Sequence, residues 1–204
     1  IRVTTYTFPS IVPATNTFEL ISNTRTFQSP LTNAVQTVGR KGSLWKISMQ
    51  FNNLTGADRA TMQAFLAKLN GQQHRFYVQD HGYTRRGTAP NPADTLLVNG
   101  AGQTGATLNA DGATLSRTNY MRAGDYVSFN NELHMVTDDC SSSGTGTVAI
   151  PIAPPIRKPT DDNDLIDYLV PVLGVFMLTS SASWDTQPGL VSSFTVEAVE
   201  DVLA

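Results

Sequence analysis

The segment from Leu44 to Val78 constrains the fold of this chain more than any other stretch. In Leu44–Phe51 apolar and polar residues alternate, with Trp45, Ile47, Met49 and Phe51 between Lys46, Ser48 and Gln50. A period of two places one set of side chains on each face of a strand. The pattern predicts a strand with one face on a core.

A helix is predicted directly after this strand, over residues 55–70. Thr55 stands where an N-cap belongs and Asp58 follows in the first turn, near the positive helix end. Asn70-Gly71 supplies a left-handed residue that ends a helix. The apolar stripe consists of Met62, Phe65, Leu66 and Leu69. Since Phe76–Val78 reads as the next strand, we expect a short amphipathic helix lying on a sheet.

No other stretch predicts a helix of this quality, so the chain is expected to be mainly β. Of its 204 residues, 15 are Gly and 11 are Pro, as in β-rich proteins with many turns. The predicted fold is a β-sandwich or barrel-like body with one packed amphipathic helix and an inserted small β-barrel domain.

The charge and cysteine content exclude several classes of function. The net charge is −3 with no basic run, which disfavours tight binding of duplex DNA or RNA. Cys140 is the only cysteine, so an internal disulfide is excluded, and so is a metal site built from cysteines of one chain.

The first residues lack the positive start and apolar block of a signal peptide. No run approaches the roughly 18 apolar residues of a membrane helix. The longest candidate, Leu169–Leu178, is short and contains Pro171 and Gly174. We expect a soluble protein made in the cytoplasm, unless processing has removed a leader.

The remaining strands are short. They are expected at Ile1–Phe8, Thr17–Ile21, Thr95–Val98, Ala106–Leu108, Thr114–Leu115, Tyr126–Phe129, Glu132–Thr137, Thr147–Ile152, Tyr168–Val170, Val175–Thr179, around Trp184, and at Ser193–Val199. Asn130-Asn131 is a candidate hairpin turn, because Asn tolerates positive φ. The polar segment Asn23–Arg40 is a long loop, an extended arm or an irregular strand.

Two changes in composition suggest an insertion. The chain reads as a linker from Thr84 to Pro92, and four prolines between Pro151 and Pro159 mark the exit from the next run of short strands. We therefore predict that residues 1–84 and 160–204 form one body with the helix. Residues 85–159 form a smaller β-domain inserted into it.

Two groups of residues that contain histidine are candidate chemical sites. His134, Asp138, Asp139 and Cys140 lie within seven positions, and a nucleophilic Cys beside a His is a recurrent catalytic pair. Here His134 belongs to a strand and Cys140 begins a turn without an activating helix start, so a structural role is favoured. His74 and His81 are separated by a strand and form no metal-binding motif.

Two loops resemble ligand-binding motifs only in part. Asp161–Asp164 is acidic but lacks the Gly and terminal Glu of a calcium loop. Gly100–Gly105 matches Gly-x-Gly-x-x-Gly but does not open a helix, so its amides are not aimed at a phosphate. We favour a solvated turn for Asp161–Asp164, and nucleotide binding at Gly100–Gly105 is disfavoured.

Three carboxylates and two tryptophans are the candidates for carbohydrate chemistry. Asp58 with Glu197 or Asp185 is a candidate acid pair of a glycosidase. Trp45 and Trp184 are candidate sugar platforms, although Trp45 lies on the apolar face of its strand. No catalytic residue, cofactor-binding residue or metal ligand is assigned.

Several local patterns together resemble the distal tail proteins of long-tailed bacteriophages. They are the strand with Trp45, the helix Gly56–Leu69 with Asn70-Gly71, the stretch Arg122–Phe129 with Leu133–Val136, Pro155–Arg157, and Phe176–Leu178 with Trp184 and Phe194–Glu197. The resemblance covers most of the chain after residue 40, in short apolar pieces.

The resemblance implies a structural virion protein without catalysis. Such a protein forms a ring, commonly a hexamer, at the distal end of the tail tube and joins the tube to tail-hub, fibre or receptor-binding proteins. The inserted domain projects outward, and Asn23–Arg40 is a candidate for contacts between subunits or with the tube. DNA passes through the ring, a passage that weak negative charge suits. The expected location is the tail tip of the virion, after assembly in the host cytoplasm.

Two other classes of function stay open. A carbohydrate- or receptor-binding β-module would use exposed aromatics such as Tyr83, Tyr120 or Tyr126. A cell-envelope hydrolase would need an acid pair at catalytic separation. Only the ring protein predicts assembly of identical copies.

Overall fold

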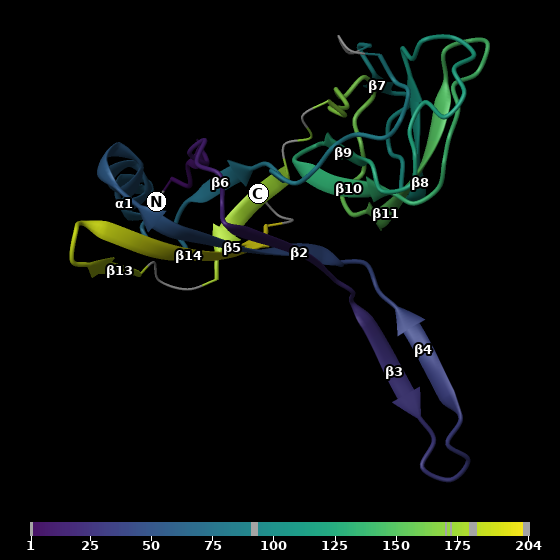
Figure 1. Ribbon diagram of the computed structural model, residues 1–204. Helices are drawn as coiled ribbons and strands as arrows, with labels where there is room; N and C mark the ends of the chain where they lie inside the picture. Colours follow the sequence, from purple (N-terminus) through teal and green to yellow (C-terminus); the bar gives the residue numbers. More distant parts are fainter. Residues whose placement is uncertain (1, 91–93, 170, 172, 180–182, 202–204) are drawn as a thin grey trace.

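The computed structural model describes residues 2–90, 94–169, 171, 173–179 and 183–201. The chain is mainly β, as the sequence predicted, and is built from two sheets, a separate hairpin and one helix within the described residues. Figure 1 shows the two sheets side by side, with the hairpin extending away from both.

The first sheet has seven strands drawn from both ends of the chain. Its order is β1 (Thr5–Thr7), β6 (Arg75–Val78), β12 (Leu173–Leu178), β14 (Val191–Glu200), β5 (Leu44–Leu54) and β2 (Thr15–Ile21), with β13 (Trp184–Gln187) also paired to β14. β1 and β6 run parallel, whereas all other pairs are antiparallel.

The helix α1 (Gly56–Leu69) covers the inner face of this sheet. Its predicted stripe is buried, and so are the four alternating apolar residues of β5. β14 contributes Phe194, Val196 and Ala198 to the same core. The strand–helix–strand prediction for residues 44–78 is confirmed.

The two ends of α1 differ in how well the sequence predicted them. Asn70 takes the left-handed conformation, with φ 48° and ψ 53°, as expected. Thr55 is the N-cap by position, but its side chain makes no capping hydrogen bond, so that expectation was wrong. Thr55 is extended, with φ −127° and ψ 165°, and Gly56 follows it with φ +52°, outside the right-handed helical region.

The second sheet has five strands and its own core. Its order is β7 (Leu97–Val98), β8 (Gly105–Asp111), β11 (Val148–Ile156), β10 (Glu132–Val136) and β9 (Tyr126–Phe129). Asn130 and Asn131 join β9 to β10 with φ 48° and 60°, the predicted hairpin turn.

Two predicted strands are absent from the described structure. Thr114–Leu115 is not a strand, because the Thr114 amide donates to the carboxylate of Asp94 and not to a neighbouring strand. Tyr168 is buried in the second core outside any strand, and the segment before it makes only isolated bridges. Val170 lies outside the described residues.

Each sheet takes its strands from different parts of the chain, as an inserted domain would require. The first sheet takes its described strands from residues 5–78 and 173–200, and the second takes them from residues 97–156. Ile166 and Tyr168 pack into the second core, several residues past the predicted exit. The boundaries at 84/85 and 159/160 stay predictions.

Asp125 holds the linker that enters the second sheet. Its buried carboxylate accepts hydrogen bonds from the backbone amides of Arg86, Gly87 and Arg122 at 2.7–2.9 Å. A Cβ on Gly87 would lie 2.5 Å from the carbonyl oxygen of Tyr120. The linker is therefore packed closely against the second sheet at this point.

No helix in the described parts of the chain combines the length and the apolar character that crossing a membrane requires.

Candidate functional site: a projecting arm and a buried charge cluster

The segment that the sequence left open, Asn23–Arg40, forms a regular β-hairpin. It consists of β3 (Thr24–Gln28) and β4 (Val35–Gly39), paired antiparallel without a bulge. The hairpin continues the ribbon made by β2 and β5, from which it projects (Figure 1). We call residues 24–39 the arm.

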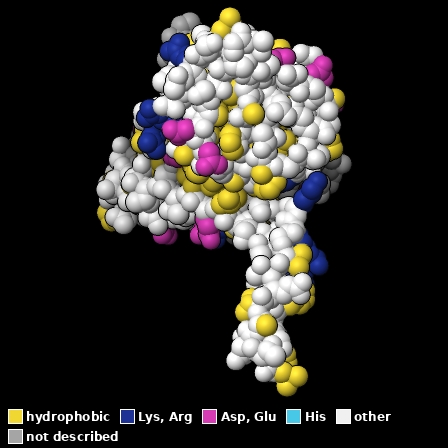
Figure 2. Space-filling model, turned by 90° about the vertical axis from the view of Figure 1, so that its right-hand side faces the viewer, with side chains coloured by type: hydrophobic (Ala, Val, Ile, Leu, Met, Phe, Trp, Pro, Cys, Tyr) yellow, Lys and Arg dark blue, Asp and Glu magenta, His cyan; other side chains and the backbone are white. Residues whose placement is uncertain are grey.

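Every residue of both arm strands is exposed, so neither face packs on the body. The register puts Phe27 and Val38 on one face and Val35 on the other. Leu31, at the tip, is 94% exposed, and Phe27 is 56% exposed. Figure 2 shows these hydrophobic groups along an arm that stands clear of the molecule.

Charge is confined to the base of the arm. Arg25, Arg40 and Lys41 lie there, whereas no charged residue occurs from Phe27 to Gln36. Lys and Arg side chains accordingly appear near the root of the arm in Figure 2. The distal half can be buried without desolvating an ion.

Asn23 makes hydrogen bonds across the base of the arm. Its side-chain amide donates to the carbonyl of Lys41 at 2.9 Å, and its own carbonyl accepts from the Arg40 amide. Gly42 has φ +108°, a value that favours glycine. These contacts form the corner between the arm and the first sheet.

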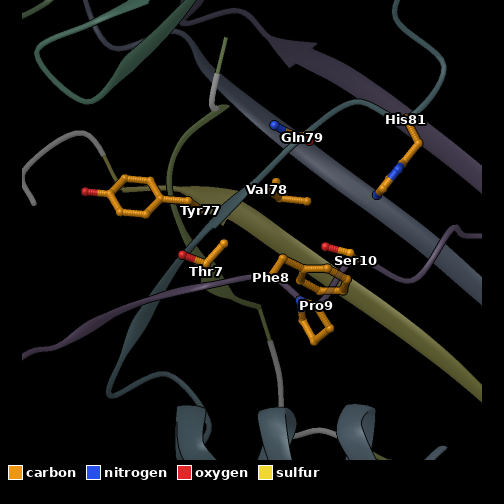
Figure 3. A pocket seen from close by; sticks show the side chains of 8 residues that line it. All are labelled: Thr7, Phe8, Pro9, Ser10, Tyr77, Val78, Gln79 and His81. Carbon is orange, nitrogen blue, oxygen red and sulfur yellow. The ribbon is translucent and has the colours of Figure 1, made fainter. Parts of the chain in front are cut away.

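Two hollows flank β1, at the end of the body away from the arm. One, of about 450 Å³, lies between β1 and α1 and is lined by Tyr6, Thr7, Pro9, Thr61, Ala64, Phe65 and Lys68. The other, of about 180 Å³, is bounded by Tyr77 at one end and His81 at the other (Figure 3). Neither hollow is lined by a carboxylate.

A buried charge cluster joins the two sheets. Arg157, after β11, makes a two-pronged ion pair with Glu200 of β14, with nitrogen–oxygen distances of 2.6 and 2.7 Å. Glu200 also accepts from the backbone amides of Trp45 in β5 and Leu133 in β10. One carboxylate therefore contacts both sheets.

Glu132 and His134 of β10 extend this cluster. Glu132 lies 3.4 Å from Nε of Arg157 and 3.3 Å from Nε2 of His134, and neither of these two nitrogens makes a hydrogen bond in the described structure. Nδ1 of His134 is 2.8 Å from the carbonyl of Pro154, so Nδ1 donates there.

Neighbouring groups shift the pKa values of Glu132 and Arg157 in the cluster. Burial alone would raise the pKa of Glu132, but His134 and Arg157 outweigh burial and the pKa is lowered. Burial likewise opposes the charge of Arg157, whereas Glu200 outweighs burial and raises its pKa. Both groups are thus held charged.

The structure does not assemble the His134–Cys140 pair into a nucleophilic site. His134 faces Glu132 and Pro154 and stacks on Phe129. Cys140 is buried, and its backbone forms an isolated antiparallel β-bridge with Met121. Burial raises the pKa of the Cys140 thiol to about 11. Asp139 accepts from the Ala123 amide and Asp138 from the Thr137 hydroxyl.

The two partial loop motifs contact each other. The Gly100 amide donates to Asp162 at 2.8 Å, and the Gly102 amide donates to the carbonyl of Thr160. One amide of the glycine turn therefore binds the acidic loop, and a second binds the residue just before that loop, so neither is free for a phosphate. His74 accepts from the Thr4 amide, and His81 lines the smaller hollow.

The structure does not bring Asp58 together with Glu197 or Asp185 as an acid pair. Asp58 is exposed in the first turn of α1, which covers the core face of the first sheet. Glu197 is exposed on the opposite face of β14, away from Phe194, Val196 and Ala198. Asp185 pairs in register with Ser193 and therefore lies on the same outer face as Glu197.

The aromatic residues named for sugar binding are mostly buried. Tyr120 and Tyr126 are buried and Tyr83 is half-buried, so the expectation that they are exposed was wrong. Tyr120 donates to Asp94, and Tyr126 packs edge-on against Tyr83. Trp45 is a core residue whose indole donates to the carbonyl of Leu133, and only Trp184 is well exposed, at 41%.

Sequence reasoning missed Glu132, Arg157 and Glu200, although a signal was present for the last. Glu200 continues the alternation of Phe194, Val196 and Ala198, and therefore falls on the inward face of β14. A charge at an inward position predicts a buried partner.

Within the described residues, no group of three or more His, Cys, Asp or Glu side chains is placed to hold a metal ion. No family model matches the sequence, and a search of curated proteins found no match.

Proposed function

We propose that this chain is a structural virion protein that forms a ring at the distal end of a bacteriophage tail, without catalysis. The ring would join the tail tube to the hub, fibre or receptor-binding proteins. The local sequence patterns described above suggest this family, with a hexamer as its common assembly.

The arm is the observation that carries the proposal. A two-stranded hairpin exposed on both faces is marginally stable alone in water, so its apolar groups favour a covered state. A protein that works by assembly supplies such a cover, whereas a monomeric enzyme or a lone binding module has no evident use for it.

The free edge beside the arm adds support. β2 is an outer strand of the first sheet, and its pairing with β5 runs from Thr15 to Ile21 without a bulge. It carries neither Lys nor Pro, which discourage pairing with another strand, and Glu19 is its one charged residue. Assembly with neighbouring copies would protect this edge.

Light scattering on the purified protein, followed by negative-stain microscopy of the same peak, tests the proposal. We expect closed rings with a central hole and a mass of about 132 kDa, six times the 22.0 kDa chain. A monomer at every concentration, or open filaments, would contradict it.

A further inference from the structure

We propose that the tip of the arm docks into the hollow between β1 and α1 of the next copy in the ring. The inference rests on the proposed function and names the two surfaces that meet. The occupant is a second copy of this chain, and the contact is head to tail.

Position excludes docking within one chain. The arm leaves the body from the β2–β5 ribbon, whereas β1 and α1 lie at the opposite end (Figure 1). The corner at Asn23 and Gly42 holds the arm away from its own hollow. Two complementary surfaces at opposite ends of one chain make a heterologous contact, which closes into a ring when the rotation allows.

The chemistry of the two surfaces matches. The distal arm offers Phe27, Leu31 and Val35 and carries no charge from Phe27 to Gln36. The hollow offers Tyr6, Pro9, Ala64 and Phe65, and Lys68 is the one charged residue in its lining. Docking would bury apolar groups on both sides and leave the basic base of the arm outside.

The edge of β1 offers a second means of attachment. The Arg75 amide donates to the Thr4 carbonyl, and the Phe8 amide donates to the Tyr77 carbonyl. Because backbone groups alternate along a strand, Thr5 and Thr7 direct their amides and carbonyls away from β6. An arm strand of the neighbour can pair there while its side chains enter the hollow.

Cysteine cross-linking tests this contact directly. The native Cys140 is buried, so we expect few disulfides to form through it. Copies carrying Leu31→Cys are mixed with copies carrying Ala64→Cys, exchanged and oxidised. We expect a disulfide-linked heterodimer as the main product, and a ladder of larger products when one chain carries both changes. Ala149→Cys, an exposed alanine on β11, is the matched control and should give none.

Complementation provides a second readout. Leu31→Ser removes the arm tip and Ala64→Arg blocks the hollow, and both sites are exposed, so each variant should fold with an unchanged thermal midpoint. Each alone is expected to lose the ring. Mixed, they retain one intact arm and one intact hollow, and should form dimers and nothing larger.

The outcomes separate the two proposals. If wild-type rings form but the cross-link fails and both variants keep their rings, the docking inference is overturned and the ring protein stands. If arm variants keep their rings but lose binding to tail tubes, the tube occupies the arm and the inference is likewise overturned. If the wild-type protein is monomeric at all concentrations, the proposed function fails.

Discussion

Glu200 links the two sheets through a single side chain. Its carboxylate accepts from Arg157, from Trp45 in the first sheet and from Leu133 in the second. Removing one member of a buried ion pair leaves the other charge uncompensated, which costs about 3–5 kcal/mol. A substitution at Glu200 is therefore expected to destabilise both sheets.

Glu200→Gln should lower the free energy of unfolding by about 3 kcal/mol, because Arg157 loses its closest anion. Glu197→Gln is the matched control, since Glu197 is exposed on the other face of β14, and its expected effect is within about 0.5 kcal/mol. Urea unfolding of both variants measures the difference. Equal losses of unfolding free energy in the two variants would show that the buried ion pair contributes no more to stability than an exposed carboxylate.

The lowered pKa of Glu132 predicts loss of stability in acid. A carboxyl whose pKa is lower in the folded protein stabilises it above the unfolded pKa, about 4.3, and this stabilisation is lost as the pH falls through the folded value. Urea midpoints measured from about pH 6 down to about pH 3 should fall less steeply in Glu132→Gln than in the wild type. Parallel slopes would contradict the assigned ionisation.

At the scale of elements, the two ends of α1 show that a residue can occupy a capping position without making the capping contact. Thr55 occupies the N-cap without a capping bond, whereas Asn70 uses its tolerance of positive φ to end the helix. We expect Thr55→Ala to change the unfolding free energy by less than about 0.5 kcal/mol, against the usual cap loss of about 1 kcal/mol. Asn70→Ala should cost about 1 kcal/mol. Thermal unfolding of the two variants tests this. A loss of about 1 kcal/mol or more in Thr55→Ala would contradict the absence of a capping hydrogen bond at Thr55.

Local periodicity explains which elements the sequence predicts. β5 and α1 each bury one face, so their apolar residues recur with periods of two and of three to four. The arm buries neither face, and its residues therefore lack an amphipathic pattern that separates strand from loop. Exposure on both sides removes the signal on which strand prediction depends.

The charge cluster escaped prediction for a different reason. Trp45 and Glu200 are 155 positions apart, and Leu133 and Glu200 are 67 apart. The alternation in β14 turns Glu200 inward but does not identify its partner. Such pairings depend on how the two sheets meet, which local pattern does not specify.

At the scale of the whole molecule, the arm is separable from the body. Neither hydrophobic core includes a residue of the arm, and the corner contacts lie at residues 23 and 40–43. Folding of the body and assembly of the ring should therefore respond differently to changes in the arm.

Replacing residues 24–39 by Asn-Gly should leave the thermal midpoint of the body nearly unchanged, because no core contact is lost and Asn-Gly suits a tight hairpin. The same variant should remain monomeric where the wild type forms rings. A full-length arm with Ser at Phe27, Leu31, Val35 and Val38 separates the length of the arm from its apolar groups and should also fail to assemble. Light scattering and thermal unfolding of the three proteins are the measurements. A large drop in the midpoint after deletion would make the arm part of the fold, and rings from the Ser variant would show that backbone pairing alone suffices.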